Sequence, residues 1–208
     1  APFAAGAFAL GAEPIGALPA YDALIADMKP APAQESGEDD DAILLYTGGT
    51  TGRAKGVRLT HRNIVANGFQ CIPGLRVSGR DTYLHVAPMF HSADLLGTST
   101  TLVGGAHAYL AQATPEALLG AIQDRRATLT MLPPTVIIMT LQKCRPADYD
   151  LTSLRFIYYG SAPMAPEWIR KAIEALPGVD IAQGYGLTET APILTHLDFA
   201  DHRRALAT

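Results

Sequence analysis

Residues 46–56 read Tyr-Thr-Gly-Gly-Thr-Thr-Gly-Arg-Ala-Lys-Gly and directly follow the apolar run Ala42-Ile43-Leu44-Leu45. Glycine lets backbone N–H groups come close to an anion, threonine adds hydroxyl donors, and Arg53 or Lys55 supplies positive charge. This composition is typical of a polyphosphate-binding loop. It is not the Walker loop, in which Lys-Ser or Lys-Thr follows the glycines at a fixed spacing. A flexible turn between two strands fits the composition equally well, because glycine-rich turns are common.

The charges around this loop are unevenly distributed. Asp and Glu are absent from residues 42–80, whereas Lys and Arg recur there: Arg53, Lys55, Arg58, Arg62, Arg76 and Arg80. The whole chain of 208 residues carries a formal net charge of −4. A cationic segment inside an acidic chain indicates a specific anion site. It argues against nucleic acid as a partner, because a nucleic-acid surface needs a broader basic excess.

Length and composition limit the class of protein. With 48% hydrophobic and 17% charged residues, the chain can bury one good core. Residues 1–18 are apolar but lack Lys and Arg, unlike a signal peptide, and no apolar run is long enough for a transmembrane segment. Cys71 and Cys144 lie far apart without a CxxC motif, so we expect buried thiols, no zinc or iron–sulfur site, and a cytoplasmic protein.

Strand-like and helix-like segments alternate along the chain. Strands are expected at 42–46, 57–59, 82–87, 107–110, 128–132, 154–159 and 179–182. Helices are expected at 61–71, 89–103, 115–126, 134–143 and 166–177, the third capped by Thr114. This alternation predicts a doubly wound α/β fold, with a mainly parallel sheet and helices on both faces.

Sheets of this kind bind ligands at the carboxyl ends of their strands. The expected strands end in polar or glycine-rich loops at 47–56, 87–92, 160–163 and 183–190. The last three read Ala-Pro-Met-Phe-His-Ser, Gly-Ser-Ala-Pro and Gln-Gly-Tyr-Gly-Leu-Thr-Glu-Thr. Loops on one edge of the sheet would converge on one crevice, which predicts a nucleotide site.

These loops resemble the motifs of a known family. Residues 46–57 resemble the phosphate-loop signature of the adenylate-forming (ANL) superfamily, which includes acyl-CoA synthetases, luciferases and the adenylation domains of peptide synthetases. Residues 87–92 are similar to its Pro-x-Phe-His element, 159–164 to its adenine-binding Gly-x-Ala-Pro element, and 185–190 to its Tyr-Gly-x-Thr-Glu element. Gly49 stands where many members carry Ser. The motifs occur in family order and imply part of the large N-terminal domain of an acyl-CoA synthetase.

The resemblance implies a role for each matching residue. The β- and γ-phosphates of ATP would contact the loop residues Thr47, Gly48, Gly49, Thr50, Thr51, Gly52 and Lys55. Adenine would lie against Gly160, Ser161 and Ala162, and Tyr185, between Gly184 and Gly186, would stack on it. Thr188 would hydrogen-bond the α-phosphate, and Glu189 would hold Mg²⁺. His91 would orient the substrate carboxylate or gate its access.

Each residue also has a simpler interpretation when it is taken alone. Thr188-Glu189 is a common helix start, Tyr185 could be a half-buried aromatic residue, and His91 could be a hydrogen-bonded loop histidine. Their joint occurrence in family order favours the site. The remaining histidines are interpreted as surface or packing residues, namely His61, His85, His107, His196 and His202. Trp168 and residues 137–139 are interpreted as core.

The reaction implied by the resemblance is attack of a carboxylate on the α-phosphorus of ATP, followed by transfer of the acyl group to coenzyme A. Amino-acid-activating relatives place Asp directly after the Phe of the second motif, where it pairs with an ammonium group. Here that position is His91, which disfavours an amino acid, because a buried unpaired ammonium ion is costly. Asp94 could replace that Asp only if its side chain turned inward. A fatty acid is therefore the favoured small-molecule substrate.

Two alternatives remain open, the adenylation domain of a peptide synthetase and a non-catalytic nucleotide-binding module. In the family, a ribose-binding Asp and a small C-terminal domain with a catalytic Lys follow the last motif, and neither follows Thr190 here. We expect a partial preceding segment and linker at 1–41, the central ATP-binding part at 42–193, and a tail at 194–208. We expect this chain alone to turn over poorly or not at all.

Overall fold

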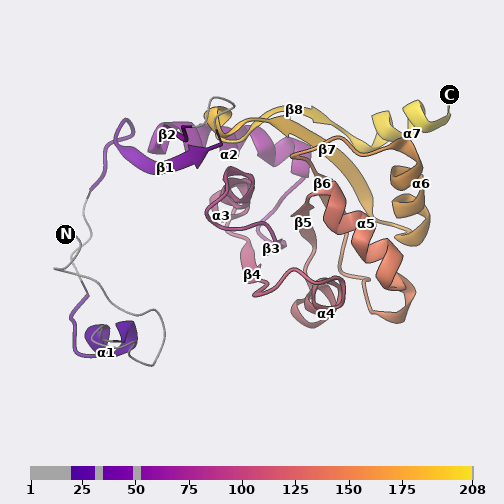
Figure 1. The fold of residues 1–208 in the computed structure, drawn as a ribbon, viewed down its shortest axis with the longest axis horizontal. Helices are drawn as coiled ribbons and strands as arrows, with labels where there is room; N and C mark the ends of the chain where they lie inside the picture. Colours follow the sequence, from indigo (N-terminus) through magenta and orange to yellow (C-terminus); the bar gives the residue numbers. More distant parts are fainter. Residues whose placement is uncertain (1–19, 31–34, 49–52, 208) are drawn as a thin grey trace. The chain divides into compact units, whose positions relative to one another are not determined.

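The computed structural model describes residues 20–30, 35–48 and 53–207. The chain divides into two units, residues 1–36 and residues 37–208. Among its described residues the first unit contains one short helix, α1 (Tyr21–Ile25). The other helices and strands drawn in Figure 1 belong to the second unit.

A six-stranded sheet forms the centre of the second unit (Figure 1), in the order β4-β3-β5-β6-β7-β8. Neighbouring strands from β4 to β7 are parallel, and β8 runs antiparallel to β7 at the edge. The mainly parallel α/β fold is therefore confirmed. The strands are β3 (Thr82–His85), β4 (Ala106–Tyr109), β5 (Leu129–Leu132), β6 (Phe156–Tyr159), β7 (Asp180–Gly186) and β8 (Ile193–Leu197).

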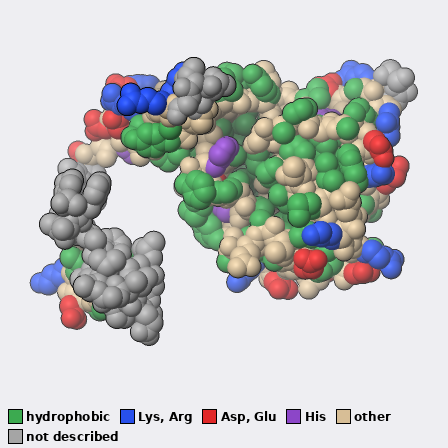
Figure 2. Space-filling model, viewed as in Figure 1, with side chains coloured by type: hydrophobic (Ala, Val, Ile, Leu, Met, Phe, Trp, Pro, Cys, Tyr) green, Lys and Arg blue, Asp and Glu red, His purple; other side chains and the backbone are tan. Residues whose placement is uncertain are grey.

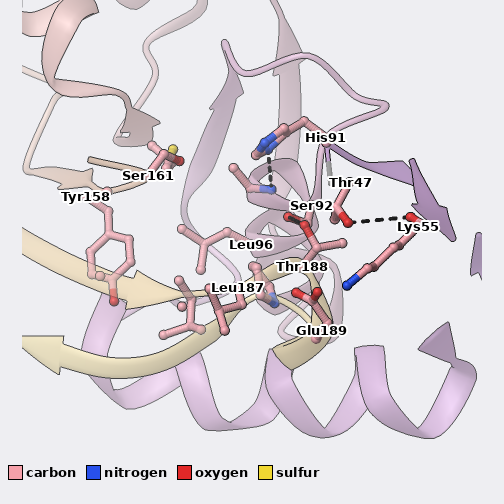
Figure 3. A pocket seen from close by; sticks show the side chains of 18 residues that line it. Thr47, Lys55, His91, Ser92, Leu96, Tyr158, Ser161, Leu187, Thr188 and Glu189 are labelled. Atoms are coloured by element: carbon pink, nitrogen blue, oxygen red, sulfur yellow. Dashed lines mark hydrogen bonds between the residues drawn. The ribbon is translucent and has the colours of Figure 1, made fainter. Parts of the chain in front are cut away.

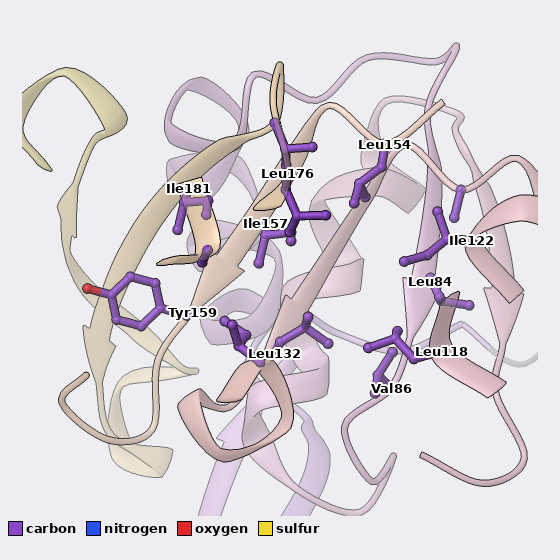
Figure 4. Close-up of a cluster of buried hydrophobic side chains, with 14 of the residues drawn as sticks. Leu84, Val86, Leu118, Ile122, Leu132, Leu154, Ile157, Tyr159, Leu176 and Ile181 are labelled. Atoms are coloured by element: carbon purple, nitrogen blue, oxygen red, sulfur yellow. The ribbon is translucent and has the colours of Figure 1, made fainter. Parts of the chain in front are cut away.

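Helices cover both faces of this sheet because its buried strands are apolar on both sides. In β6, Ile157 and Tyr159 belong to one hydrophobic cluster and Phe156 and Tyr158 to another. The first cluster, drawn in Figure 4, also receives side chains from α4 (Pro115–Arg125), α5 (Pro134–Lys143) and α6 (Pro166–Ala175). The second receives them from α2 (His61–Leu75) and the 3₁₀ helix η1 (Ser92–Gly97). The remaining helices are α3 (Thr98–Leu102), η2 (Pro146–Asp148), η3 (Thr188–Thr190) and α7 (Phe199–Ala207).

The first two strands of this unit form a separate sheet. β1 (Asp41–Thr47) and β2 (Lys55–Thr60) pair antiparallel, with Thr47 opposite Lys55, so the expectation that 42–46 belongs to the parallel sheet was wrong. Leu45 and Leu59 of this hairpin pack with Ala191 in a small core of their own. A short antiparallel hairpin needs no crossover helix, in contrast to a pair of parallel strands.

The segment 89–103 was also predicted incorrectly, as one continuous helix. It contains η1 and α3, and η1 begins only after His91, whose Nδ1 accepts a hydrogen bond from the backbone N–H of Ala93 at 3.1 Å. By contrast, α5 has the bounds that the sequence predicts, and Thr114 caps α4 as expected. Met139 of α5, expected in the core, is 41% exposed, whereas Ile137 is buried.

Acidic residues neutralise much of the cationic segment. Arg58 pairs with Asp41, Arg62 with Glu38 and Asp39, and Arg76 with Asp180. On the face of the molecule drawn in Figure 2, basic and acidic side chains lie beside one another at the margins, with apolar side chains between them. The anion site that the sequence predicts therefore depends on fewer cations than the composition suggests.

The two cysteines differ in burial. Cys71 is buried, which raises the pKa of its thiol to about 11, and Cys144 is partly buried. The helices among residues 20–30, 35–48 and 53–207 are all too short or too polar to cross a membrane.

Candidate active site

A cavity of about 420 Å³ lies beside the carboxyl ends of the parallel strands. Thr47, Gly48 and Lys55 of the hairpin line it, together with residues that follow β3, β6 and β7. The sequence-predicted residues among the latter are His91, Gly160, Ser161, Gly184, Gly186, Thr188 and Glu189. The structure therefore brings together residues from all four motifs, and the volume is in the range of ligand-binding pockets.

One side of the cavity is polar (Figure 3). Lys55 and Glu189 both line the cavity, and the Thr47 hydroxyl is 3.5 Å from the Lys55 backbone carbonyl oxygen, which accepts its hydrogen bond. Among the described residues the Lys55 ammonium group has no ion-pair partner, so its charge is available to an anion. Gly49, Thr50, Thr51 and Gly52 lie outside the described residues, and their expected role stays a prediction.

Thr188 is tied to the segment that follows β3. Its Oγ1 lies 3.1 Å from the Oγ of Ser92, the residue next to His91. Because the Ala93 N–H donates to Nδ1 of His91, a neutral His91 ring carries its proton on Nε2. His91 thus has one N–H donor to offer to a carboxylate or phosphate oxygen.

The opposite side of the cavity is apolar, and sequence reasoning missed it. Its side chains are those of Ala93 and Leu96 of η1, Met131 of β5, Tyr158 of β6 and Ile193 of β8. Met131 and Tyr158 alternate with residues of the other face of the sheet, so strand alternation was the signal that could have found them. A surface of this kind suits the apolar part of an acid.

Asp94 does not face this cavity. Its Oδ1 lies 2.8 Å from Nδ1 of His85, and both side chains are buried. Nε2 of His85 lies 2.8 Å from Nδ1 of His107, whose Nε2 lies 3.0 Å from the Thr101 hydroxyl. Burial and the neighbouring His85 lower the pKa of His107. His85 and His107 are thus members of a hydrogen-bonded array, a more specific role than the packing expected from the sequence.

Asn67 of α2 is a second residue that sequence reasoning missed. Its buried amide donates to the carbonyl oxygens of Thr190 and Ile193 at 3.2 and 2.7 Å, and its Oδ1 accepts from the Ile193 N–H at 3.3 Å. These bonds hold the segment that joins Glu189 to the apolar side of the cavity. Nothing in the sequence singles out an asparagine in an amphipathic helix.

The residues expected to contact adenine differ in where the structure places them. Gly160 and Ser161 line the cavity, whereas Ala162 and Tyr185 are not among its lining residues, and Tyr185 is 58% exposed. A Cβ atom at Gly186 would overlap the carbonyl oxygen of Pro192, so only glycine fits there. Stacking of Tyr185 on adenine stays a prediction.

The mainly parallel α/β sheet with a cavity at the carboxyl edge of its strands is the arrangement in which open α/β folds bind ligands. The chain belongs to the AMP-binding enzyme family, whose family model matches residues 7–208. This match confirms the resemblance seen in the motifs.

The chain is similar to CoA ligases of plants and bacteria. It is 36% identical to 4-coumarate--CoA ligase 3 of Arabidopsis thaliana over 84% of this chain and 33% of that protein. It is 34% identical to a feruloyl-CoA synthase of an Amycolatopsis species, over 92% and 39% of the two chains. The inhibitor-bound N-terminal domain of FACL13 from Mycobacterium tuberculosis aligns with a TM-score of 0.79 and 28% identity, covering 94% of this chain and 50% of that one. The chain spans between a third and two fifths of the length of these two curated relatives.

Proposed function

We propose that this chain carries the ATP- and acid-binding site of an AMP-forming acid–thiol ligase. The observation that carries the proposal is the division of one cavity into a polar side, with Thr47, Lys55, Thr188 and Glu189, and an apolar side, with Leu96, Met131 and Tyr158. Polyphosphate fits the first side and the apolar part of a carboxylic acid fits the second. His91 and Ser92 line the same cavity, and Ser92 is bonded to Thr188.

In the proposed first step a carboxylate oxygen attacks the α-phosphorus of ATP. A carboxyl–phosphate bond forms, the bond from the α-phosphorus to the bridging oxygen breaks, and pyrophosphate leaves with that oxygen. A carboxylate is already ionised at neutral pH, so the residues have to position and neutralise charge rather than remove a proton. Lys55 would neutralise the leaving phosphates, Thr188 would donate to the α-phosphate, and His91 Nε2–H would orient the carboxylate.

The donor set fits Mg²⁺ held chiefly by phosphates. Glu189 offers one carboxylate at the polar side, and the described residues contain no group of three or more potential metal-ligating His, Cys, Asp or Glu side chains. One or two protein carboxylates plus substrate phosphates are the usual environment of this ion. When bound, Mg²⁺ would neutralise charge on the phosphates; Glu189 would position it.

The acid is proposed to be a plain carboxylic acid. Among the residues that the structure describes, none on the apolar side offers a carboxylate to an ammonium group, and Asp94 is bonded to His85 instead. The sequence motifs favour a fatty acid, and the names of the similar ligases favour an aryl-propenoic acid such as 4-coumarate or ferulate. Both kinds combine a carboxylate with an apolar body, as this cavity requires.

Coenzyme A is the proposed acceptor. Its sulfur would attack the carbonyl carbon of the acyl-adenylate, form a thioester and release AMP with the bridging oxygen, while the thiol proton passes to solvent. Support for this step comes from the CoA ligases to which the chain is similar. The alternative of a non-catalytic nucleotide-binding module predicts binding without turnover.

Acid-dependent exchange of labelled pyrophosphate into ATP tests the proposal, measured in the polypeptide as its gene encodes it. Exchange that requires a carboxylic acid and is slower in the Lys55→Ala variant supports the proposed ligase function. ATP binding without exchange for any acid supports the binding module instead. Lys143→Ala, on α5 and not among the lining residues, is the matched control and should exchange normally.

A further inference from the structure

Tyr158 stands between two cavities. Its ring lines the 420 Å³ cavity of the candidate site and also a second cavity of about 90 Å³ between α2 and β8. The second cavity is bounded by Cys71, Gly74 and Leu75 on the α2 side and by Thr195 and His196 on the β8 side. Ile193 is the other residue that lines both cavities. The side chain of Tyr158 therefore separates the site from space that lies behind it.

A bond to β8 holds Tyr158 in this position. Its hydroxyl oxygen lies 3.2 Å from Nδ1 of His196, and the two rings stack with centroids 5.4 Å apart and an interplanar angle of 16°. Burial raises the pKa of Tyr158, and partial burial lowers the pKa of His196. Both rings are thus uncharged at neutral pH, and the hydrogen bond joins two neutral groups.

The backbone makes room for this pair of rings. A Cβ atom at Gly184 of β7 would overlap the Tyr158 ring, so only glycine fits beneath it. On the far side, a Cβ atom at Gly74 of α2 would lie 3.2 Å from Nδ1 of His196. Tyr158 is only 2% exposed, so it has little freedom to move aside without displacing these neighbours.

We propose that the Tyr158–His196 pair is the end wall of the acid-binding side and sets the greatest length of acid that the site accepts. This inference deepens the proposed function and rests on it. In Figure 3, Lys55 and Glu189 lie at the side of the cavity away from Tyr158, with Leu96 between. An acid whose carboxylate lies near His91 has its apolar part directed along Leu96 and Met131, and that part ends at the Tyr158 ring. Compact acids, such as aryl-propenoic or short straight-chain acids, fit; a long straight chain would need the cavity behind.

The length dependence of pyrophosphate exchange tests this wall in the polypeptide as its gene encodes it. The probes are straight-chain acids of increasing length together with phenylpropenoic acid. Tyr158→Ala joins the two cavities and should raise kcat/KM for long relative to short acids by about ten-fold or more, since one methylene in an apolar pocket is worth roughly ten-fold or more. Tyr158→Phe keeps the ring and should keep the length limit. Adding Cys71→Leu to Tyr158→Ala refills the space behind and should restore part of the limit.

If Tyr158→Ala still activates phenylpropenoic acid and its length limit is unchanged, the proposal that Tyr158 limits acid length is wrong. The proposed function would remain intact. A limit that shifts equally in Tyr158→Phe would also overturn the wall, because the ring would then not be the barrier. Tyr158→Leu replaces Tyr158→Ala if that variant does not fold, and the same outcomes apply. Absence of exchange with every acid in the unaltered protein would overturn the proposed function itself, and the wall with it.

Discussion

Oδ1 of Asp94 lies 2.8 Å from Nδ1 of His85, and this bond turns the Asp94 carboxylate away from the cavity that Ala93 and Leu96 line. The sequence left open whether Asp94 could receive the ammonium group of an amino acid. In the structure Asp94 bonds His85 and is not among the residues that line the cavity, which argues against that role. The pair stabilises η1, the element that follows His91, and does not face a substrate.

Asp94→Asn is therefore expected to change stability and not substrate class. The variant keeps the side-chain size but weakens a buried charge-assisted hydrogen bond, which should lower the free energy of unfolding by about 1–3 kcal/mol. Chemical denaturation measures this change. Pyrophosphate exchange with α-amino acids should be absent both before and after the substitution. Amino-acid-dependent exchange that disappears in Asp94→Asn would contradict this assignment.

Glu189→Gln should weaken the response to Mg²⁺. The amide keeps the shape but loses the charge that the ion prefers, so the Mg²⁺ concentration for half-maximal pyrophosphate exchange should rise by about ten-fold or more. Glu167→Gln is the matched control, because Glu167 lies on α6 and pairs with Lys171 outside the cavity. An equal Mg²⁺ response in both variants would remove Glu189 from the proposed metal site.

Asp81 makes stability depend on acid pH. Burial alone would raise its pKa, but hydrogen bonds from Arg155, Thr128 and Ser78 lower the pKa to about 2, from a model-compound value of 3.8. The stabilisation is therefore present above about pH 4 and is lost as the pH falls toward 2. Asp81→Asn should cost about 2 kcal/mol of unfolding free energy at pH 7 and almost nothing near pH 2. Denaturation at several pH values checks this, and a pH-independent difference would contradict it.

His107 should also make stability fall with falling pH, but in a higher pH range than Asp81. Because burial and His85 lower its folded-state pKa, protonation favours the unfolded chain, and stability is lost as the pH falls below about 6.5. His107→Gln removes the titrating group, so this variant should lose less stability than the unaltered protein between pH 7.5 and pH 5. Thermal unfolding at these pH values measures the difference. Parallel losses in the two proteins would show that His107 does not contribute.

Asn67→Ala should disturb the site without touching a substrate. It leaves the partly buried carbonyl oxygens of Thr190 and Ile193 without their donor, and each unsatisfied group should cost about 1–3 kcal/mol of unfolding free energy. KM for ATP should rise, because the same segment carries Glu189. Val65→Ala, on an exposed part of α2, should change stability by less than about 0.5 kcal/mol. An Asn67→Ala variant as stable as Val65→Ala would refute the anchoring role.

Local patterns in the sequence predicted the parallel sheet and the loops that carry the motifs. Alternating segments predicted the parallel sheet, and four motifs predicted most of the cavity lining, because loops on one edge of such a sheet must converge. The antiparallel pairing of the consecutive strands β1 and β2 was missed because the segment between them was interpreted as a ligand loop at the end of a parallel strand. Strand alternation places Met131 and Tyr158 on one face of the sheet, but they and Asn67 were missed because the sequence does not show which buried residues adjoin a cavity.

The separation of the β1–β2 hairpin from the six-stranded sheet has a consequence for divergence within the family. Thr47 and Lys55 belong to one hydrogen-bonded sheet, and Met131 and Tyr158 of the proposed acid side belong to another. Substitutions that reshape the acid side therefore leave the backbone pairing of the phosphate side untouched. Under the proposed function, a lineage could therefore exchange one carboxylic acid for another by repacking strand interiors while the proposed ATP side stays the same.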